Sequence, residues 1–244
     1  LYADGQEHWY ERGGKMPIPR RAPRPDSLRI GPKLSSGPRT RNWRQISPSS
    51  LEAEGLINVS QLLAIEPSLA ALRGTLIHTW FAQIIWLDDS VAIPDDKCLQ
   101  RVGQRIAPHQ TEQWLEEQIH QFRNMLEQPS VKAVLTKPKT DDDLVLWHER
   151  PFVVRNSDHL LRGAFDRVVL FRRDGRIRGA ELVDYKTDAV GTGESDEHSL
   201  DMLVETYRPQ IEAYRQALSQ LLQLASSKIS ARLVFVGAGK LVEL

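Results

Sequence analysis

Apolar and polar positions alternate in the middle of the chain and recur at helical intervals on either side. The run 164–171, AFDRVVLF, is rich in β-branched and aromatic residues, and the turn signal RDGR at 173–176 separates it from AELVDYK at 180–186. Two such runs around a short turn predict a β-hairpin. Because side chains on a strand alternate between faces, Asp184 and Lys186 are expected to lie on the same face of this hairpin.

Helical periodicity surrounds the predicted hairpin. A strongly apolar helix is predicted over 73–87, after an apolar helical pattern at 62–72. Residues 112–126 form an amphipathic pattern, and residues 200–224 carry apolar side chains at intervals of three and four. Helices are therefore expected on both sides of the strands in the sequence.

Two more strands and several polar connections complete the predicted elements. Residues 144–154 resume strand character, with Pro151 indicating an edge position or a bulge, and residues 232–236 form the last strand. Polar and charged stretches predict surface connections at 88–96, 136–143 and 188–199.

A change in composition divides the chain near residue 47. Residues 1–46 are rich in proline and arginine and have almost no apolar periodicity, so we expect a basic Pro-rich linker or extension. It is either a solvated tether or a basic arm that follows nucleic-acid phosphates. The serines around Pro48 suit a helix N-cap and open the domain expected over 47–244. The chain begins with Leu1, which indicates a piece of a longer polypeptide.

Composition narrows the class of protein. Hydrophobic residues make up 41% and charged residues 26%, as in soluble globular proteins, while the 32 basic and 32 acidic residues balance and favour no partner. The single cysteine, Cys98, excludes an intramolecular disulfide or a four-cysteine metal site within this chain and fits the cytoplasm. Since no apolar run reaches membrane-spanning length, no membrane contact is expected.

Acidic and basic side chains meet on the predicted hairpin. Asp166, on the first strand, can reach Asp184 and Lys186 if the register allows. Two carboxylates suit a hard divalent cation such as Mg²⁺. Water and substrate phosphate would complete the coordination shell of this ion. Singly, Asp184 and Lys186 are also compatible with a surface ion pair, Asp166 with a salt bridge to Arg167, and His78 with an ordinary core histidine.

Six short motifs follow one another, each on a predicted element: S-P-S-S-L-E from Ser47, G-x-x-x-H from Gly74, E-x-P-F from Glu149, G-x-x-D from Gly163, D-Y-K-T from Asp184 and Q-x-x-x-Y from Gln210. In this order they resemble the RecB-like branch of the PD-(D/E)XK nuclease superfamily, found at the C-terminus of AddA and RecB helicase-nucleases. The resemblance covers roughly residues 47–236. It implies an α/β, restriction-endonuclease-like core with a central mixed β-sheet flanked by helices.

The resemblance also implies roles for single residues. It implies that a Mg²⁺ or Mn²⁺ ion is bound by the side chains of His78, Asp166 and Asp184 and by the backbone carbonyl of Tyr185. It assigns catalysis to Lys186 together with the two aspartates. A third set is implied at the substrate, where Gln210 and Tyr214 help to position phosphate and Glu149 assists a ligand or a second metal.

The function implied by the resemblance is metal-dependent hydrolysis of DNA phosphodiester bonds, by an exonuclease rather than an endonuclease, at single-stranded ends. The expected setting is a helicase-nuclease in double-strand break repair and recombination. No Walker-type motif occurs here, so the helicase is expected elsewhere in the same polypeptide or in a partner subunit. Two alternatives stay open: a catalytically silent nuclease-fold module that binds DNA or a partner, and a Cas4-like defence nuclease, which the lack of four cysteines disfavours.

Overall fold

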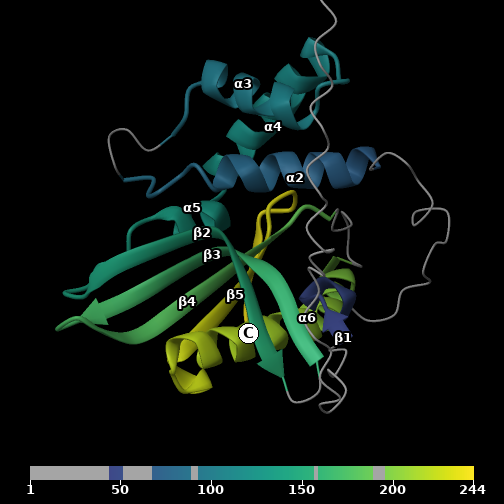
Figure 1. Ribbon diagram of the computed structural model, residues 1–244. Helices are drawn as coiled ribbons and strands as arrows, with labels where there is room; N and C mark the ends of the chain where they lie inside the picture. The colour runs from purple at the N-terminus through teal and green to yellow at the C-terminus, as the bar shows by residue number, and fades with distance from the viewer. Residues whose placement is uncertain (1–43, 52–67, 89–92, 157–158, 189–195) are drawn as a thin grey trace, which may run out of the picture. The chain divides into compact units, whose positions relative to one another are not determined.

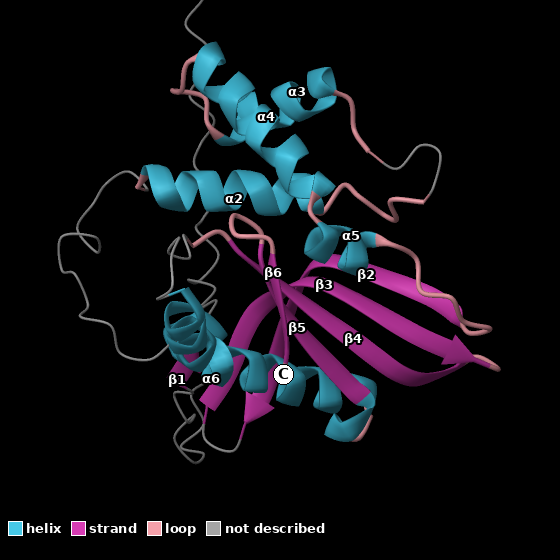
Figure 2. Cartoon of the chain, turned by 180° about the vertical axis from the view of Figure 1, so that it is seen from behind, coloured by secondary structure: helices cyan, strands magenta, loops and turns pink. Residues whose placement is uncertain are grey.

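A mixed β-sheet with helices on both faces forms the described part of the chain (Figures 1 and 2). The computed structural model describes residues 44–51, 68–88, 93–156, 159–188 and 196–244. Most of the predicted linker, up to residue 43, and the first part of the helical pattern at 62–72 lie outside these ranges. None of the described helices is long and apolar enough to cross a membrane.

Six strands make up the sheet, in the order β1-β3-β4-β5-β6, with β2 paired to β3 as well. The strands are β1 (Arg44–Ile46), β2 (Asp143–Asn156), β3 (His159–Arg173), β4 (Arg176–Lys186), β5 (Ile229–Phe235) and β6 (Lys240–Glu243). The pairs β1–β3 and β4–β5 are parallel, and the other pairs are antiparallel. The predicted α/β class with a central mixed sheet is thus confirmed.

The predicted hairpin is formed by β3 and β4. Arg173 pairs with Arg176 across a two-residue turn in which Asp174 and Gly175 both have positive φ, 52° and 74°. Positive φ at both central residues is the geometry that asparagine, aspartate and glycine favour in tight hairpins. The RDGR signal therefore forms the turn, and a register shift between Phe171 and Arg172 sets the alignment of β3 with β4 beyond it.

In the described ranges, five helices and two short 3₁₀ turns accompany the sheet: α2 (Leu69–Phe81), α3 (Asp96–Ile106), α4 (Glu112–Glu127), α5 (Pro129–Leu135), α6 (Asp196–Leu222), η1 (Pro48–Leu51) and η2 (Ser226–Lys228). The prediction of a helix up to residue 87 was wrong, because the chain turns after Phe81. The apolar residues Ile84 and Trp86 continue the hydrophobic pattern, but they are buried from an irregular segment instead of a helix.

Several short elements escaped the sequence pattern. Helix α3 packs Leu99, Val102 and Ile106 into the core at helical intervals, a stripe that was missed in the sequence, and α5 is only seven residues long. Strand β6 follows β5, which is therefore not the last strand, and β1 lies inside the segment expected to be a linker. Helix α6 begins at Asp196, within the surface connection expected up to residue 199.

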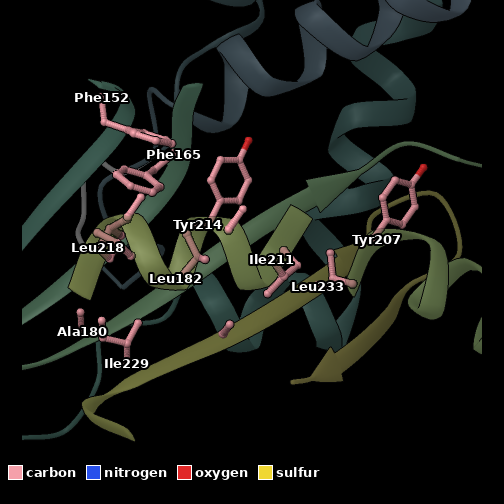
Figure 3. Packing of buried hydrophobic residues seen from close by; sticks show 14 of the residues in the cluster. Phe152, Phe165, Ala180, Leu182, Tyr207, Ile211, Tyr214, Leu218, Ile229 and Leu233 are labelled. Atoms are coloured by element: carbon pink, nitrogen blue, oxygen red, sulfur yellow. The ribbon is translucent and has the colours of Figure 1, made fainter. Parts of the chain in front are cut away.

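Strand β4 is buried on both faces and separates two apolar clusters. Ala180 and Leu182 pack under α6, with Ile211 and Leu218 of that helix (Figure 3). The alternate residues Val183 and Tyr185 belong to the cluster on the other face, which α2, α4 and α5 cover (Figure 2). The same alternation encloses Asp184, which is only 3% exposed, on the α6 face.

Strands β2 and β3 exchange their faces at one common place. On β2, Trp147 and Phe152 both pack on the α6 face although five residues separate them, and on β3 Phe165 and Val168 do so across three residues. Strict alternation would put each pair on opposite faces. The exchange coincides with Glu149, whose φ of 41° is rare for a residue with a side chain.

Two helical glycines test the helix packing with opposite expected signs. A Cβ at Gly103 of α3 would overlap the buried Leu115 side chain of α4, whereas a Cβ at Gly74 of α2 meets only Thr187 Oγ1, at 3.6 Å. Gly103→Ala should therefore lower the free energy of unfolding by about 1–2 kcal/mol. Gly74→Ala should raise it by up to about 1 kcal/mol, since alanine favours the helix. Urea unfolding followed by circular dichroism measures both, and equal effects of the two would contradict this packing.

Candidate active site

An opening between β3 and β4 creates the site. The ladder between these strands stops at the pair Arg167 and Val183, one residue short of Asp166 and Asp184. Beyond it the backbone N–H of Tyr185 donates to the Asp166 carboxylate, with 2.9 Å from N to Oδ2. Since the N–H and C=O of one strand residue point to the same side, the Tyr185 carbonyl also faces this opening.

Three side chains from three elements converge at the opening. His78 Nδ1, from α2, lies 3.4 Å from Asp166 Oδ2 and 3.6 Å from Glu149 Oε1. Each residue can offer one ligand atom so that all three lie within 4.8 Å of one another. A pocket of about 370 Å³ lined by Gly74, Thr75, His78, Thr79 and Glu149 leads to this cluster from the surface.

The position of Glu149 depends on the exchange of faces described above. Its neighbour His148 points towards α2, so in a regular strand Glu149 would point to the opposite face. The positive φ of Glu149 turns its carboxylate towards His78 instead. Backbone strain of this kind costs on the order of 1–3 kcal/mol and persists where the surroundings impose it, often at functional sites.

The second half of the site lies on the α6 face. Lys186 Nζ is 3.2 Å from Asp184 Oδ2 and donates to Gln210 Oε1 at 2.6 Å. The same ammonium lies 4.0 Å from the centre of the Tyr207 ring, within range of a cation–π interaction. The predicted common face of Asp184 and Lys186 is thus present, and α6 fixes the lysine there.

Two residues of this half were missed in the sequence. Tyr207 precedes Gln210 by three residues, which places both on one side of α6, and its hydroxyl donates to Asp188 Oδ2 at 2.8 Å. Both were hidden because Tyr207 also fits the apolar stripe of α6, and Asp188 fell in a stretch expected to be a polar loop. A tyrosine spaced from Gln210 by one helical turn was the available signal.

The predicted site residues thus fall into three groups: a cluster at the opening, a set under α6, and two tyrosines whose rings are buried. His78, Glu149 and Asp166 form the cluster, and Asp184, Lys186 and Gln210 lie together under α6. The Tyr185 side chain is buried against Phe81, with 4.4 Å between ring centres. Tyr214 packs its ring against Phe152 and Phe165 in the apolar core (Figure 3).

The salt bridge between Asp166 and Arg167 that the sequence left open does not form. The Arg167 guanidinium is directed away from its neighbour and donates to the backbone carbonyls of Ile84 and Ile85. Asp166 is thereby left to His78 and to the Tyr185 N–H.

The crowding of carboxylates changes the protonation of the site. Burial raises the pKa of Asp184, and the charge of Asp166 raises it further, to about 7, against the opposing charges of Lys186 and His78. Burial alone would lower the pKa of His78, but the charge of Asp166 and contacts with Asp166 and Glu149 raise it to about 11. In the metal-free site, protons on His78 and Asp184 therefore offset negative charge that a bound cation would otherwise offset.

The donor set fits a divalent metal ion. Carboxylate oxygens and an imidazole nitrogen are ligands that Mn²⁺ and Mg²⁺ accept in proteins. Asp184 Oδ2 is buried and forms an ion pair with Lys186 Nζ at 3.2 Å, although the ammonium is not well directed for a hydrogen bond to it. A cation would satisfy this oxygen more fully than the poorly directed ammonium does.

Comparison with known proteins gives one result. A model of the PD-(D/E)XK nuclease superfamily matches residues 52–243, which includes every residue of the site. No curated protein matches the chain.

The raised pKa of Asp184 predicts how stability depends on pH in the metal-free protein. A carboxyl group whose pKa is higher in the folded state stabilises the fold below its unfolded pKa, and this contribution disappears as the pH rises through the folded pKa. Between pH 4 and pH 7 the free energy of unfolding in EDTA should therefore fall, by at most about 4 kcal/mol from this group. Asp184→Asn should remove this loss and make the metal-free protein more stable than the wild type at pH 8.

The control for this experiment is Asp201→Asn, an exposed aspartate on α6. It should keep the pH dependence of the wild type. The contribution of His78 is lost separately, as the pH rises from its unfolded value towards 11. Identical stability curves for Asp184→Asn and the wild type from pH 4 to 8 would contradict the burial and crowding of this carboxylate.

Proposed function

Since the chain belongs to the PD-(D/E)XK nuclease superfamily, we propose that it hydrolyses DNA phosphodiester bonds with the help of Mg²⁺ or Mn²⁺. The observation that carries the proposal is the cluster of His78, Glu149 and Asp166 with the pair of Asp184 and Lys186 beside it. A nuclease of this kind needs a cation site and a separate positive group next to one opening. The residues proposed for both roles come from different elements around the end of the β3–β4 ladder, which supports the proposal.

The proposed ligands of the cation are His78, Asp166 and Asp184, with the Tyr185 carbonyl, and Glu149 assists them. When bound, a divalent cation offsets the charge of the phosphate and lowers the pKa of a water molecule. The N–H of Tyr185 holds the Asp166 carboxylate, and the turned backbone of Glu149 directs its carboxylate into the same space. The ligands are thus oriented by backbone geometry, which reduces the cost of binding.

Lys186 is the proposed catalytic residue. Its ammonium is positioned by Asp184, Gln210 and Tyr207. A positive charge is therefore held in a fixed position beside the acidic cluster. Such a fixed charge can hold the attacking water or stabilise negative charge that develops on the phosphate. Gln210 acts here by positioning the lysine, in addition to the phosphate contact that the resemblance implies for it and for Tyr214.

The wider role proposed for the chain follows the AddA and RecB resemblance. We propose an exonuclease module that acts on single-stranded DNA ends in the cytoplasm, joined to a helicase in the same polypeptide or in a partner subunit. Its work would be the processing of double-strand breaks for repair and recombination. The order and spacing of the six motifs support this assignment.

The test is degradation of end-labelled linear single-stranded DNA in Mg²⁺, Mn²⁺ or EDTA. Lys186→Met should lower the cleavage rate about 10²–10³-fold, because the fixed charge is lost while the metal ligands stay. Asp184→Asn should lower it as well, through the metal. Lys132→Met is the matched control, since Lys132 pairs with Glu127 at the surface of α5.

The results separate the alternatives. Metal-dependent cleavage that both site variants lose supports the proposed nuclease. Cleavage that Lys186→Met leaves intact would remove Lys186 from the mechanism. DNA binding without cleavage by the wild type, in either metal, would favour a silent binding module, and an internally labelled circular substrate distinguishes endonuclease from exonuclease action.

A further inference from the structure

A fully buried arginine lies next to the proposed metal site without being part of it. Arg167 is 1% exposed, and its two terminal nitrogens donate to the carbonyls of Ile84 and Ile85 at 2.9 and 2.7 Å. Its guanidinium lies over the ring of Trp86, 4.8 Å from the ring centre. Among the described residues, no carboxylate forms an ion pair with it.

His148 completes the arrangement from the neighbouring strand. It is the direct register partner of Arg167, and its Nε2 lies 3.3 Å from Arg167 Nη1. Its Nδ1 contacts the carbonyl of Ala82. One neutral tautomer satisfies both contacts, with Nδ1–H as donor to Ala82 and Nε2 as acceptor from Arg167.

The carbonyls that these two residues bind mark the end of α2. Ala82 is the C-cap of the helix, and Ile84 and Ile85 lie two and three residues beyond it. The Ala82 carbonyl, at the helix C-terminus, lacks an intrahelical donor and accepts from the imidazole N–H. The carbonyls of Ile84 and Ile85, in the irregular segment after the helix, accept from the buried guanidinium. Together Arg167 and His148 fasten this end of α2 to the sheet.

Each of the residues that hold the end of α2 to the sheet is close to a proposed ligand in the sequence or in the helix. His148 precedes Glu149, Arg167 follows Asp166, and the N–H of Ala82 donates to the carbonyl of His78, one helical turn away. The contacts of His78 with Asp166 and Glu149 thus depend on where α2 ends against β2 and β3. Burying a guanidinium without a carboxylate costs several kcal/mol, which apolar packing would avoid.

We propose that Arg167 and His148 are positioning residues that hold His78 against Asp166 and Glu149, an inference that rests on the proposed metal-dependent function. Neither residue touches the cation or the DNA. They act through the C-terminal end of α2, so their loss lowers metal affinity while every ligand remains. Residues that orient metal ligands in this indirect way typically change metal affinity by 10–100-fold.

The experiment is titration of the purified chain with Mn²⁺ by calorimetry, at a temperature where circular dichroism shows each variant to be folded. Arg167→Met and His148→Phe should bind Mn²⁺ at least about tenfold more weakly than the wild type. His148→Gln, which keeps one donor and one acceptor, should recover part of the affinity. Arg167→Lys should not, because an ammonium cannot bind two separate carbonyls with the fork of a guanidinium.

Arg215→Lys is the matched control. Arg215 is a partly buried arginine of α6 that donates to the backbone carbonyl of Leu244. Its substitution should lower thermal stability and leave Mn²⁺ affinity unchanged. The concentration of Mn²⁺ that gives half the maximal rate of DNA cleavage should rise in the Arg167 and His148 variants, while the rate at saturating Mn²⁺ changes little.

Two outcomes would overturn the inference in different ways. Arg167→Met and His148→Phe that melt at lower temperature but bind Mn²⁺ like the wild type would make the pair purely structural. A wild-type chain that binds no Mn²⁺ would remove the proposed metal site, and the positioning role with it. Should the Arg167 variants not fold, the comparison of His148→Phe with His148→Gln decides alone.

Discussion

Negative charge gathered at one opening of the sheet is the constraint on which the site depends. The carboxylates of Asp166 and Asp184 belong to neighbouring strands that separate where these residues stand, and Glu149 adds a third. Repulsion is strongest at Asp184, where burial excludes water, whereas Glu149 is exposed. The surrounding groups offset this repulsion with positive charge or hydrogen-bond donors: the imidazole of His78, the ammonium of Lys186 and the N–H of Tyr185. A divalent cation would offset the repulsion more fully than any of these groups.

The sequence was sufficient for the parts of the fold that regular periodicity governs. The hairpin, its turn at Asp174 and Gly175, and the common face of Asp184 and Lys186 all follow from alternation along a strand. The family match agrees with the motifs at the level of the superfamily, and its finer branch remains a prediction. Strands as short as β6 give too few apolar positions to be recognised, whereas the stripe of Leu99, Val102 and Ile106 on α3 was present in the sequence and was missed.

Departures from regular geometry were not predictable in the same way. The exchange of faces at Glu149 and Asp166 turns two side chains that strict alternation would have placed elsewhere. The apolar run after Phe81 continues the helical pattern although the helix has ended. In both places long-range contacts decide, as those of Arg167 with the chain after α2 illustrate, and such contacts leave no periodic trace in the sequence.

The two apolar clusters on either side of β4 give the site a divided origin. His78 belongs to the layer of α2, whereas Gln210 and Tyr207, which hold Lys186, belong to α6 on the other side of the sheet. Proteins open locally in cooperative units, each with its own free energy. Partial opening of the α2 layer would therefore release the metal and leave the lysine in place, while opening of α6 would do the reverse. The proposed chemistry would thus require both layers to be closed at once, and the less stable of the two would set the fraction of molecules that are competent.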